Sequence, residues 1–129
     1  MREPLTKNFF RDEYHCTGCS KQEPCRSFQD TPMDIHFTMM IQELRNRCGF
    51  PIKINSGFRC QEWNDKQEGS APESWHVQGL AVDIHCVDNI RRLAIVKHAI
   101  DIGFTDIGIA KTFIHLDNRP IIKQRIRVY

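Results

Sequence analysis

The chain has 129 residues, of which 40% are hydrophobic and 26% are charged, and its formal net charge at pH 7 is +2. A chain of this length forms one domain and buries about two-thirds of the surface that it exposes when unfolded. The nearly balanced charge argues against a dedicated nucleic-acid-binding or membrane-surface protein, and no apolar run is long enough to insert into a bilayer.

Residues 1–30 are predicted to form an irregular head, and residues 31–129 the core of the same single domain. The head contains three cysteines among turn-forming residues, in the stretch "FFRDEYHCTGCSKQEPCRSFQD". The N-terminus lacks the basic start and the apolar stretch of a signal peptide, so we expect synthesis in the cytoplasm. The chain has six cysteines, which is many for that compartment because stable disulfides are uncommon there.

Two helices are predicted in the core. From Pro32 onwards apolar residues recur at spacings near three and four, with Asp34 or Thr31 as the N-terminal cap and Gly49 as the end. Residues 88–102 show a second amphipathic helical pattern, with Asp88 or Asn89 as the N-terminal cap and Gly103 as the end.

Short strands alternate with these helices. Strand patterns cover residues 52–56 and 80–85, and two further strands, "TDIGIA" and "TFIHLDN", are separated by a turn at Lys111. The polar residues 61–73 predict a loop with a helical turn at its start, and the basic tail "KQRIRVY" is expected to be a solvated terminus. Because the last two strands form a hairpin, we predict an α+β domain with a small, largely antiparallel sheet and flanking helices.

Two of the predicted strands each place an acid and an imidazole on one face. Because side chains alternate along a strand, Asp83 shares a face with His85, and His115 shares one with Asp117. A buried ionised carboxylate is costly unless it is paired or coordinated, so two carboxylates beside imidazoles suggest a metal site. A catalytic zinc ion commonly has three His and carboxylate ligands and one water molecule, and His76, Asp83 and His115 can supply those ligands.

Three blocks of the sequence carry a resemblance to a known family. "SWHVQGLAVD" matches the pattern S-x-H-x-x-G-x-A-x-D of the M15 family of zinc D-Ala-D-Ala peptidases, which includes bacterial carboxypeptidases and phage endolysins. "INSGFR" resembles the family's S-G-Y-R segment, and "FIHLD" resembles its closing H-x-D. The resemblance runs in order from about Met33 to Asp117, and three spaced blocks are far more specific than H-x-x-G alone.

The resemblance implies a zinc ion held by His76, Asp83 and His115, and cleavage of peptide bonds next to D-amino acids in peptidoglycan stems. It also implies the compact α+β fold shared with the hedgehog signalling domain. Zinc lowers the pKa of its bound water towards ~7 and polarises the scissile carbonyl, while a carboxylate transfers the proton. Arg59 is expected to anchor the substrate and to stabilise the oxyanion, because a guanidinium stays charged and offers a planar fork of donors.

The general base is where the sequence departs from its better-known relatives. Several members carry an acid three residues before the last histidine ligand, but Thr112 occupies that position here and cannot accept the proton. Asp117 is the first candidate, because residues i and i+2 on a strand share a face about 6.5–7 Å apart. The alternative role for Asp117 is structural, such as fixing Arg119. The other candidates for the base are Asp106, Glu73 and His85.

Residues beside His76 are expected to contribute to substrate binding. Ser74 is expected to hydrogen-bond near the site, as short polar residues in such loops often do. Trp75 and Trp63 are expected to flank a substrate groove, with core packing as the alternative for at least one of them.

The cysteines admit two interpretations. One is a second, structural zinc site that combines Cys16, Cys19 and Cys25 of the head with His15, Cys48 or Cys60. The other, which the sequence favours, is disulfides formed after export or cell lysis, or free thiols. A zinc site or a disulfide would cross-link the head, whose few apolar residues cannot order it alone. Cys86 is expected to be a small buried residue.

The leading functional hypothesis is a monomeric zinc metallopeptidase that acts on bacterial cell-wall peptides. Whether it is a carboxypeptidase or an endopeptidase is left open, because that depends on how a loop closes the groove. The competing hypothesis is a non-catalytic binding module of the hedgehog kind, which keeps the fold and the zinc. Without a signal peptide, the enzyme is expected to be a phage endolysin released by a holin or a tail-associated protein carried in by a virion. The alternative is a chain trimmed of its leader.

Overall fold

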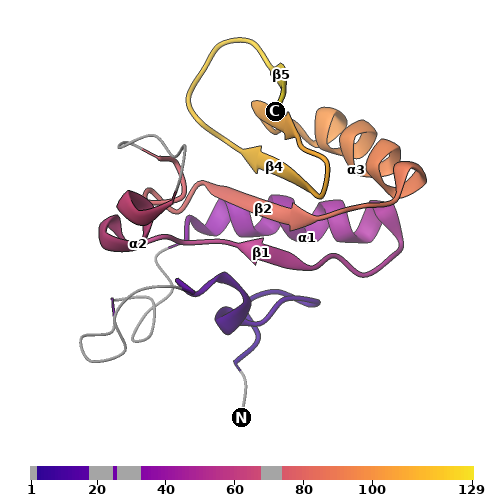
Figure 1. Ribbon diagram of the computed structural model, residues 1–129. Helices are drawn as coiled ribbons and strands as arrows, with labels where there is room; N and C mark the ends of the chain where they lie inside the picture. Colours follow the sequence, from indigo (N-terminus) through magenta and orange to yellow (C-terminus); the bar gives the residue numbers. More distant parts are fainter. Residues whose placement is uncertain (1–2, 18–24, 26–32, 68–73) are drawn as a thin grey trace.

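The computed structural model describes residues 3–17, 25, 33–67 and 74–129, and Figure 1 shows how their helices and strands are arranged. A five-stranded sheet runs through the middle of the molecule, with the strand order β1-β2-β4-β3-β5. Within the described residues, no helix combines the length and the apolar character that crossing a membrane would require.

The sheet is antiparallel except at one edge. The pairs β1 with β2, β2 with β4 and β3 with β4 are antiparallel, whereas β5 pairs with β3 in parallel. The predicted hairpin of β3 and β4 is therefore confirmed, and so is the α+β fold class. The strands are β1 (Ile54–Ser56), β2 (Ala81–His85), β3 (Asp106–Ile109), β4 (Phe113–Asp117) and β5 (Arg125–Val128).

Both predicted helices are present and end as their sequences predict. In α1 (Ile35–Cys48) the carboxylate of Asp34 accepts a hydrogen bond from the backbone N–H of the third helical residue, as an N-terminal cap does. In α3 (Asn89–Ile102) Asp88 plays the same part. Each helix stops at a glycine in the left-handed conformation, which L-residues with a side chain rarely adopt. A short third helix, α2 (Gln61–Lys66), occupies the start of the segment predicted as a loop.

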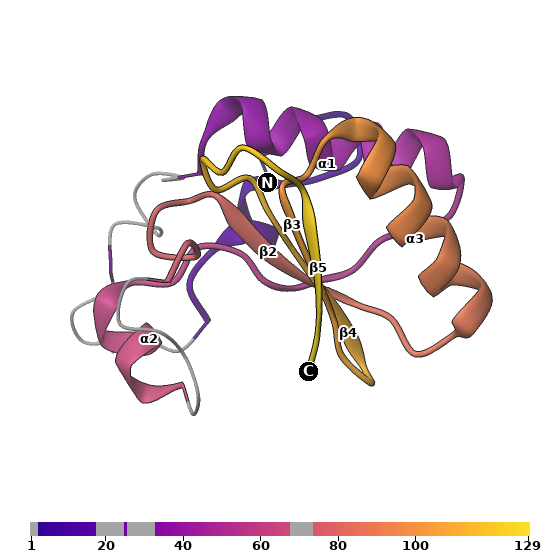
Figure 2. The ribbon, with the colours of Figure 1, turned by 90° about the horizontal axis from the view of Figure 1, so that it is seen from above.

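The helices α1 and α3 pack together on one face of the sheet (Figure 2). The apolar side of β2 and β4 meets them, because alternate residues of these strands are fully buried in one continuous core. That core includes Phe37, Ile41 and Leu44 of α1, Ile95 and Ala99 of α3, and Val82, Ile84, Ile114 and Leu116 of the two central strands. The opposite face of the sheet is left for polar side chains.

The described part of the head lies beside β1 in Figure 1 and contains a short 3-10 helix, η1 (Arg11–Tyr14). Phe9 and Tyr14 of the head are buried in the core, and the backbone carbonyl of Tyr14 accepts a 2.9 Å hydrogen bond from the N–H of Phe58. Gly57 permits this close approach of two chain segments. A Cβ atom at Gly57 would lie 2.8 Å from the Cα and 2.9 Å from the carbonyl oxygen of Tyr14.

Replacing Gly57 with alanine is therefore expected to destabilise the protein by about 1–3 kcal/mol, because rigid backbone would have to move to make room for the methyl group. Urea denaturation followed by circular dichroism measures this loss. The comparison variant is Gly108→Ala, where an added Cβ would meet side-chain atoms of Tyr129 at 2.6 Å and of His115 at 3.1 Å rather than backbone, so a smaller loss is expected. Equal stability of wild-type protein and Gly57→Ala would contradict the close packing of head and core.

The prediction for the basic tail was wrong. The tail was expected to be a solvated terminus, but residues 125–128 form the strand β5 and pair with β3. The apolar side chains of β5 are exposed, with Val128 at 79% of its full accessibility. The apolar residues of this segment therefore do not indicate a buried strand, and its arginines complete a polar network described below.

Candidate metal centre

The predicted acids and imidazoles of β2 and β4 lie side by side on the polar face of the sheet. In the antiparallel pairing of β2 and β4, Asp83 lies opposite His115 and Ala81 lies opposite Asp117. Residues directly opposite one another in such a pair point to the same side of the sheet. The predicted sharing of one face by the acids and imidazoles of the two strands is thus confirmed.

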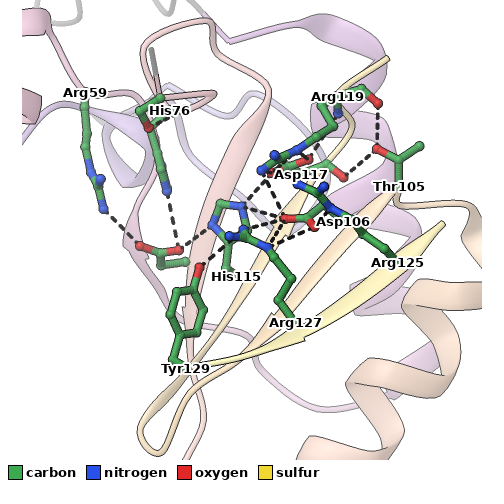
Figure 3. A network of polar contacts seen from close by, with 12 residues as sticks. Arg59, His76, Thr105, Asp106, His115, Asp117, Arg119, Arg125, Arg127 and Tyr129 are labelled. Carbon is green, nitrogen blue, oxygen red and sulfur yellow. Dashed lines mark hydrogen bonds and ion pairs between the residues drawn. The ribbon is translucent and has the colours of Figure 1, made fainter. Parts of the chain in front are cut away.

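His76, Asp83 and His115 come together although they lie on three separate segments. One potential ligand atom from each residue can be chosen so that all three lie within 4.8 Å of one another, and we call this set the histidine–aspartate cluster. Its two imidazoles approach the same oxygen: Oδ1 of Asp83 is 3.4 Å from Nε2 of His76 and 3.0 Å from Nδ1 of His115. Figure 3 shows His76 and His115 converging in this way. His76 and His115 are buried, with only 3% and 6% of their surface exposed.

Each imidazole of the cluster is oriented by a partner on its far side. Nδ1 of His76 lies 2.8 Å from the carbonyl oxygen of Gly57, which can only accept, so this nitrogen carries a proton and Nε2 faces the cluster. Nε2 of His115 lies 2.7 Å from Oδ2 of Asp117, which makes this nitrogen the donor and leaves Nδ1 to face the cluster. Metal-ligating histidines in proteins are held by this kind of outer hydrogen bond to a carbonyl or a carboxylate.

The turn before β2 positions His76. Oγ of Ser74 accepts a 3.2 Å hydrogen bond from the N–H of His76, and the carbonyl of His76 accepts one of 3.2 Å from the N–H of Arg59. Gly79 completes the turn with a φ of 72°, a conformation that favours glycine. The small residues of "SWHVQGLAVD" thus let the chain pass from a loop histidine to a strand aspartate around one point.

Arg59 lies against the cluster and contacts its carboxylate. Its Nη2 donates to Oδ2 of Asp83 at 3.1 Å, and its Nε donates to Oγ of Ser56 at 3.1 Å. The guanidinium therefore holds one oxygen of Asp83, and the other oxygen faces the two imidazoles. The predicted role of Arg59 in substrate binding stays a prediction, and its position within reach of the cluster is compatible with that role.

A second set of polar contacts lies behind His115, and we call it the carboxylate–arginine network (Figure 3). Asp117 accepts from Nε of Arg119 at 2.9 Å. Asp106 is completely buried and accepts from three arginines: Arg119 at 3.1 Å, Arg125 at 2.7 Å and Arg127 at 2.6 Å. Sequence reasoning missed Arg125 and Arg127, and the signal that could have found them was their alternation in "RIRV", which puts both on one face of a strand.

The acids and the imidazole at the centre have shifted pKa values with identifiable causes. Burial raises the pKa of Asp83, but its hydrogen bonds with His115 and His76 outweigh this effect and hold that pKa below its usual value. Burial lowers the pKa of His115, but the hydrogen bonds with Asp117 and Asp83 outweigh this effect, so its pKa lies above the usual value. For Asp117, burial is outweighed by hydrogen bonds from His115 and Arg119, and its pKa is lowered.

These shifts predict that the affinity for zinc depends on pH. A proton on His115 competes with the metal, and its pKa in the metal-free protein lies above the usual 6.5, so the competition extends into the neutral range. We expect the apparent affinity to fall by about tenfold per pH unit as the pH is lowered through that pKa, for one displaced proton. Competition titrations with a chromophoric chelator between about pH 6 and pH 8 measure this slope. An affinity that is constant over this range would contradict the prediction.

The residues fit a zinc ion at the histidine–aspartate cluster. Two neutral imidazole nitrogens and a carboxylate are a ligand set that zinc uses in catalytic sites. Asp106, His115 and Asp117 also lie close enough together to hold a cation. That second position is less favourable, because the three arginines of the carboxylate–arginine network already neutralise its two carboxylates.

The remaining predicted site residues lie at different distances from this centre. His85 is exposed at the end of β2, and Thr112 is exposed just before β4. The ring of Trp75 lies under the guanidinium of Arg119, 5.9 Å from its Cζ, whereas Trp63 is partly buried against the core. Glu73, one candidate for the general base, lies outside the described residues, as does Cys19.

The comparison with protein families agrees with the residues at this centre. The family model of Peptidase M15 matches residues 7–117, which include all three members of the histidine–aspartate cluster and the described part of the head from Lys7 onwards. Among curated proteins, no sequence matches this chain. Since the family model covers most of the chain, the chain belongs to the Peptidase M15 family of zinc metallopeptidases.

Proposed function

We propose that this metallopeptidase hydrolyses peptide bonds adjacent to D-amino acids in the stem peptides of bacterial peptidoglycan. The observation that carries the proposal is the preorganised histidine–aspartate cluster, in which one nitrogen of each imidazole faces the same carboxylate oxygen of Asp83. The resemblance of "SWHVQGLAVD", "INSGFR" and "FIHLD" to the blocks of the D-Ala-D-Ala peptidases supports the choice of substrate.

The residues in and around the cluster are proposed to have different roles in the reaction. His76, Asp83 and His115 would hold the zinc ion, which would lower the pKa of a bound water molecule and polarise the scissile carbonyl. Arg59 offers five N–H donors, and its bonds to Ser56 and Asp83 leave other donors for a substrate carboxylate or for the developing oxyanion. The Arg59 side chain is 13% exposed, so it can be reached from the solvent. Ser74 shapes the turn that carries His76, and Trp75, whose ring lies under the guanidinium of Arg119, is proposed to contact the substrate.

We further propose that Asp117 orients His115 and is not the general base. One carboxylate oxygen of Asp117 faces Nε2 of His115, and both oxygens accept from Arg119. The carboxylate is fully buried and its pKa is lowered, whereas a general base works best with a pKa near the operating pH. These contacts support the structural role that the sequence offered as the alternative for Asp117. Asp106 is enclosed by arginines in the same manner, so Glu73 and His85 are the candidates that remain.

A pair of synthetic stem peptides tests the proposed specificity. One ends in D-Ala-D-Ala and the other in D-Ala-L-Ala, and products are identified by mass spectrometry with and without a zinc chelator. We expect chelator-sensitive cleavage of the D-Ala-D-Ala peptide, or of an internal bond next to a D-residue in purified peptidoglycan. Equal cleavage of both peptides at the terminal bond would contradict the specificity. Zinc binding without any hydrolysis would contradict the enzymatic role and support the hedgehog-like binding module.

A further inference from the structure

A second group of potential metal ligands lies outside the histidine–aspartate cluster. One sulfur from each of Cys16, Cys25 and Cys60 lies within 4.8 Å of the other two, and we call this group the cysteine cluster. The sulfurs of Cys16 and Cys60 are 3.6 Å apart although 44 positions separate them in the chain. Cys16 is buried, and Cys25 and Cys60 are partly buried. Cys16 lies near the end of the described segment 3–17, and Cys60 is the N-terminal cap of α2. Cys25 lies between them in the chain.

The spacing of these sulfurs matches the ligand shell of a tetrahedral zinc ion. With zinc–sulfur bonds of about 2.3 Å, two ligands of a tetrahedral site lie about 3.8 Å apart. The observed 3.6 Å between Cys16 and Cys60 is close to this separation. It is longer than the sulfur–sulfur bond of a disulfide, which is about 2.05 Å. A disulfide would also use only two sulfurs of the cluster, whereas a thiophilic metal uses all three.

The surroundings of Cys60 are suited to a metal-bound thiolate. Its sulfur caps α2 and accepts a hydrogen bond from the backbone N–H of Trp63 at 3.5 Å. Hydrogen bonds of this kind stabilise the negative charge on a ligating sulfur. Without a metal, burial raises the pKa of the Cys60 thiol to about 12, so the metal-free cluster holds thiols that must lose their protons to bind a cation.

The cysteine cluster lies next to the segment that supports the histidine–aspartate cluster. Cys60 follows Arg59, which contacts Asp83, and Gly57 in the same segment accepts the hydrogen bond from His76. On the other side, Cys16 lies two residues after Tyr14, whose carbonyl accepts a hydrogen bond from the N–H of Phe58. A metal at the cysteine cluster would therefore join the head to the segment 57–60 and fix the residues that orient two of the three ligands of the other centre.

We propose that Cys16, Cys25 and Cys60 bind a second zinc ion, which is structural and holds the head against the segment 57–60. The argument for this second ion does not rest on the proposed peptidase activity, because none of its ligands belongs to the histidine–aspartate cluster.

Counting zinc in purified variants tests the proposal. We expect two zinc ions per chain in the wild-type protein, measured by plasma mass spectrometry after dialysis, and one in Cys16→Ser and Cys60→Ser. The double variant His76→Ala/His115→Ala is expected to keep the ion at the cysteines. The matched control is Cys48→Ser, at the end of α1 and outside the cluster, which is expected to keep both ions. Two ions in Cys60→Ser would overturn the proposal.

Two measurements on the wild-type protein keep the test decisive if a cysteine variant does not fold. X-ray absorption at the zinc edge is expected to contain a sulfur shell at about 2.3 Å, and a spectrum with nitrogen and oxygen ligands alone would overturn the proposal. Mass spectrometry of the non-reduced protein is expected to find Cys16 and Cys60 without a disulfide between them, and a Cys16–Cys60 disulfide would overturn it. Neither outcome bears on peptide hydrolysis, so failure of this proposal and failure of the peptidase proposal are distinguishable.

Discussion

Replacement of His115 with alanine is expected to remove the zinc ion of the histidine–aspartate cluster and to lower peptide hydrolysis by about a thousandfold or more. His115 supplies a ligand nitrogen and also connects the cluster to Asp117 and its arginine. A metal ion contributes several kcal/mol of charge stabilisation in the transition state, and each 1.36 kcal/mol corresponds to about tenfold in rate. Zinc content and the rate of stem-peptide cleavage measure the two effects.

The matched control for this variant is His36→Ala. His36 is exposed on α1, and that helix packs on the opposite face of the sheet from the cluster. We expect this variant to keep the zinc content and the rate of the wild-type protein. If His115→Ala cleaved peptides at the wild-type rate while its circular dichroism remained unchanged, the assignment of His115 as a ligand would be wrong.

Replacement of Asp106 with alanine is expected to cost about 2–4 kcal/mol of stability, the largest loss for any single polar residue of the sheet. The buried carboxylate of Asp106 is the common acceptor for three arginines, and its removal leaves their charges adjacent without an anion between them. Removing one partner of a buried ion pair costs about 3–5 kcal/mol. We lower this figure because the side chains of Arg125 and Arg127 are 46% and 39% exposed and can turn to water.

Thermal and urea denaturation of the metal-loaded protein check this loss. The exposed Asp101 on α3 provides the control, since Asp101→Ala removes the same side chain without touching the carboxylate–arginine network. Asp106→Asn is expected to fall between the two, because the amide oxygen still accepts hydrogen bonds from arginine but carries no charge. A stability of Asp106→Ala equal to that of the wild type would show that the network contributes nothing to folding.

The sequence predicted those features that depend on short stretches of chain. The helical spacing of apolar residues, the capping Asp34 and Asp88 and the closing glycines define α1 and α3, because capping is decided within one turn of the helix. The alternation in "AVDIH" and "FIHLD" defined the polar face, because two successive side chains of a strand cannot point to the same side. His76, Asp83 and His115 were found in this way together with the resemblance of their motifs.

Features that depend on contacts between residues distant in the sequence could not be predicted from it. The sequence did not indicate that Arg59 would bind Asp83, since 24 positions separate them and only the pairing of β1 with β2 brings them together. Nor did it indicate the strand β5, whose apolar residues are exposed and whose order comes from hydrogen bonds to β3 and from its arginines binding Asp106. The choice between a catalytic and a structural role for Asp117 likewise depends on where Arg119 lies, which the sequence does not indicate.

Anomalous diffraction at the zinc edge from crystals of the zinc-loaded protein tests the central claim most directly. We predict a peak about 2.1 Å from Nε2 of His76, from a carboxylate oxygen of Asp83 and from Nδ1 of His115, with Asp117 behind the imidazole of His115. A peak between Asp106, His115 and Asp117, or a zinc-loaded crystal with no peak at the histidine–aspartate cluster, would contradict it.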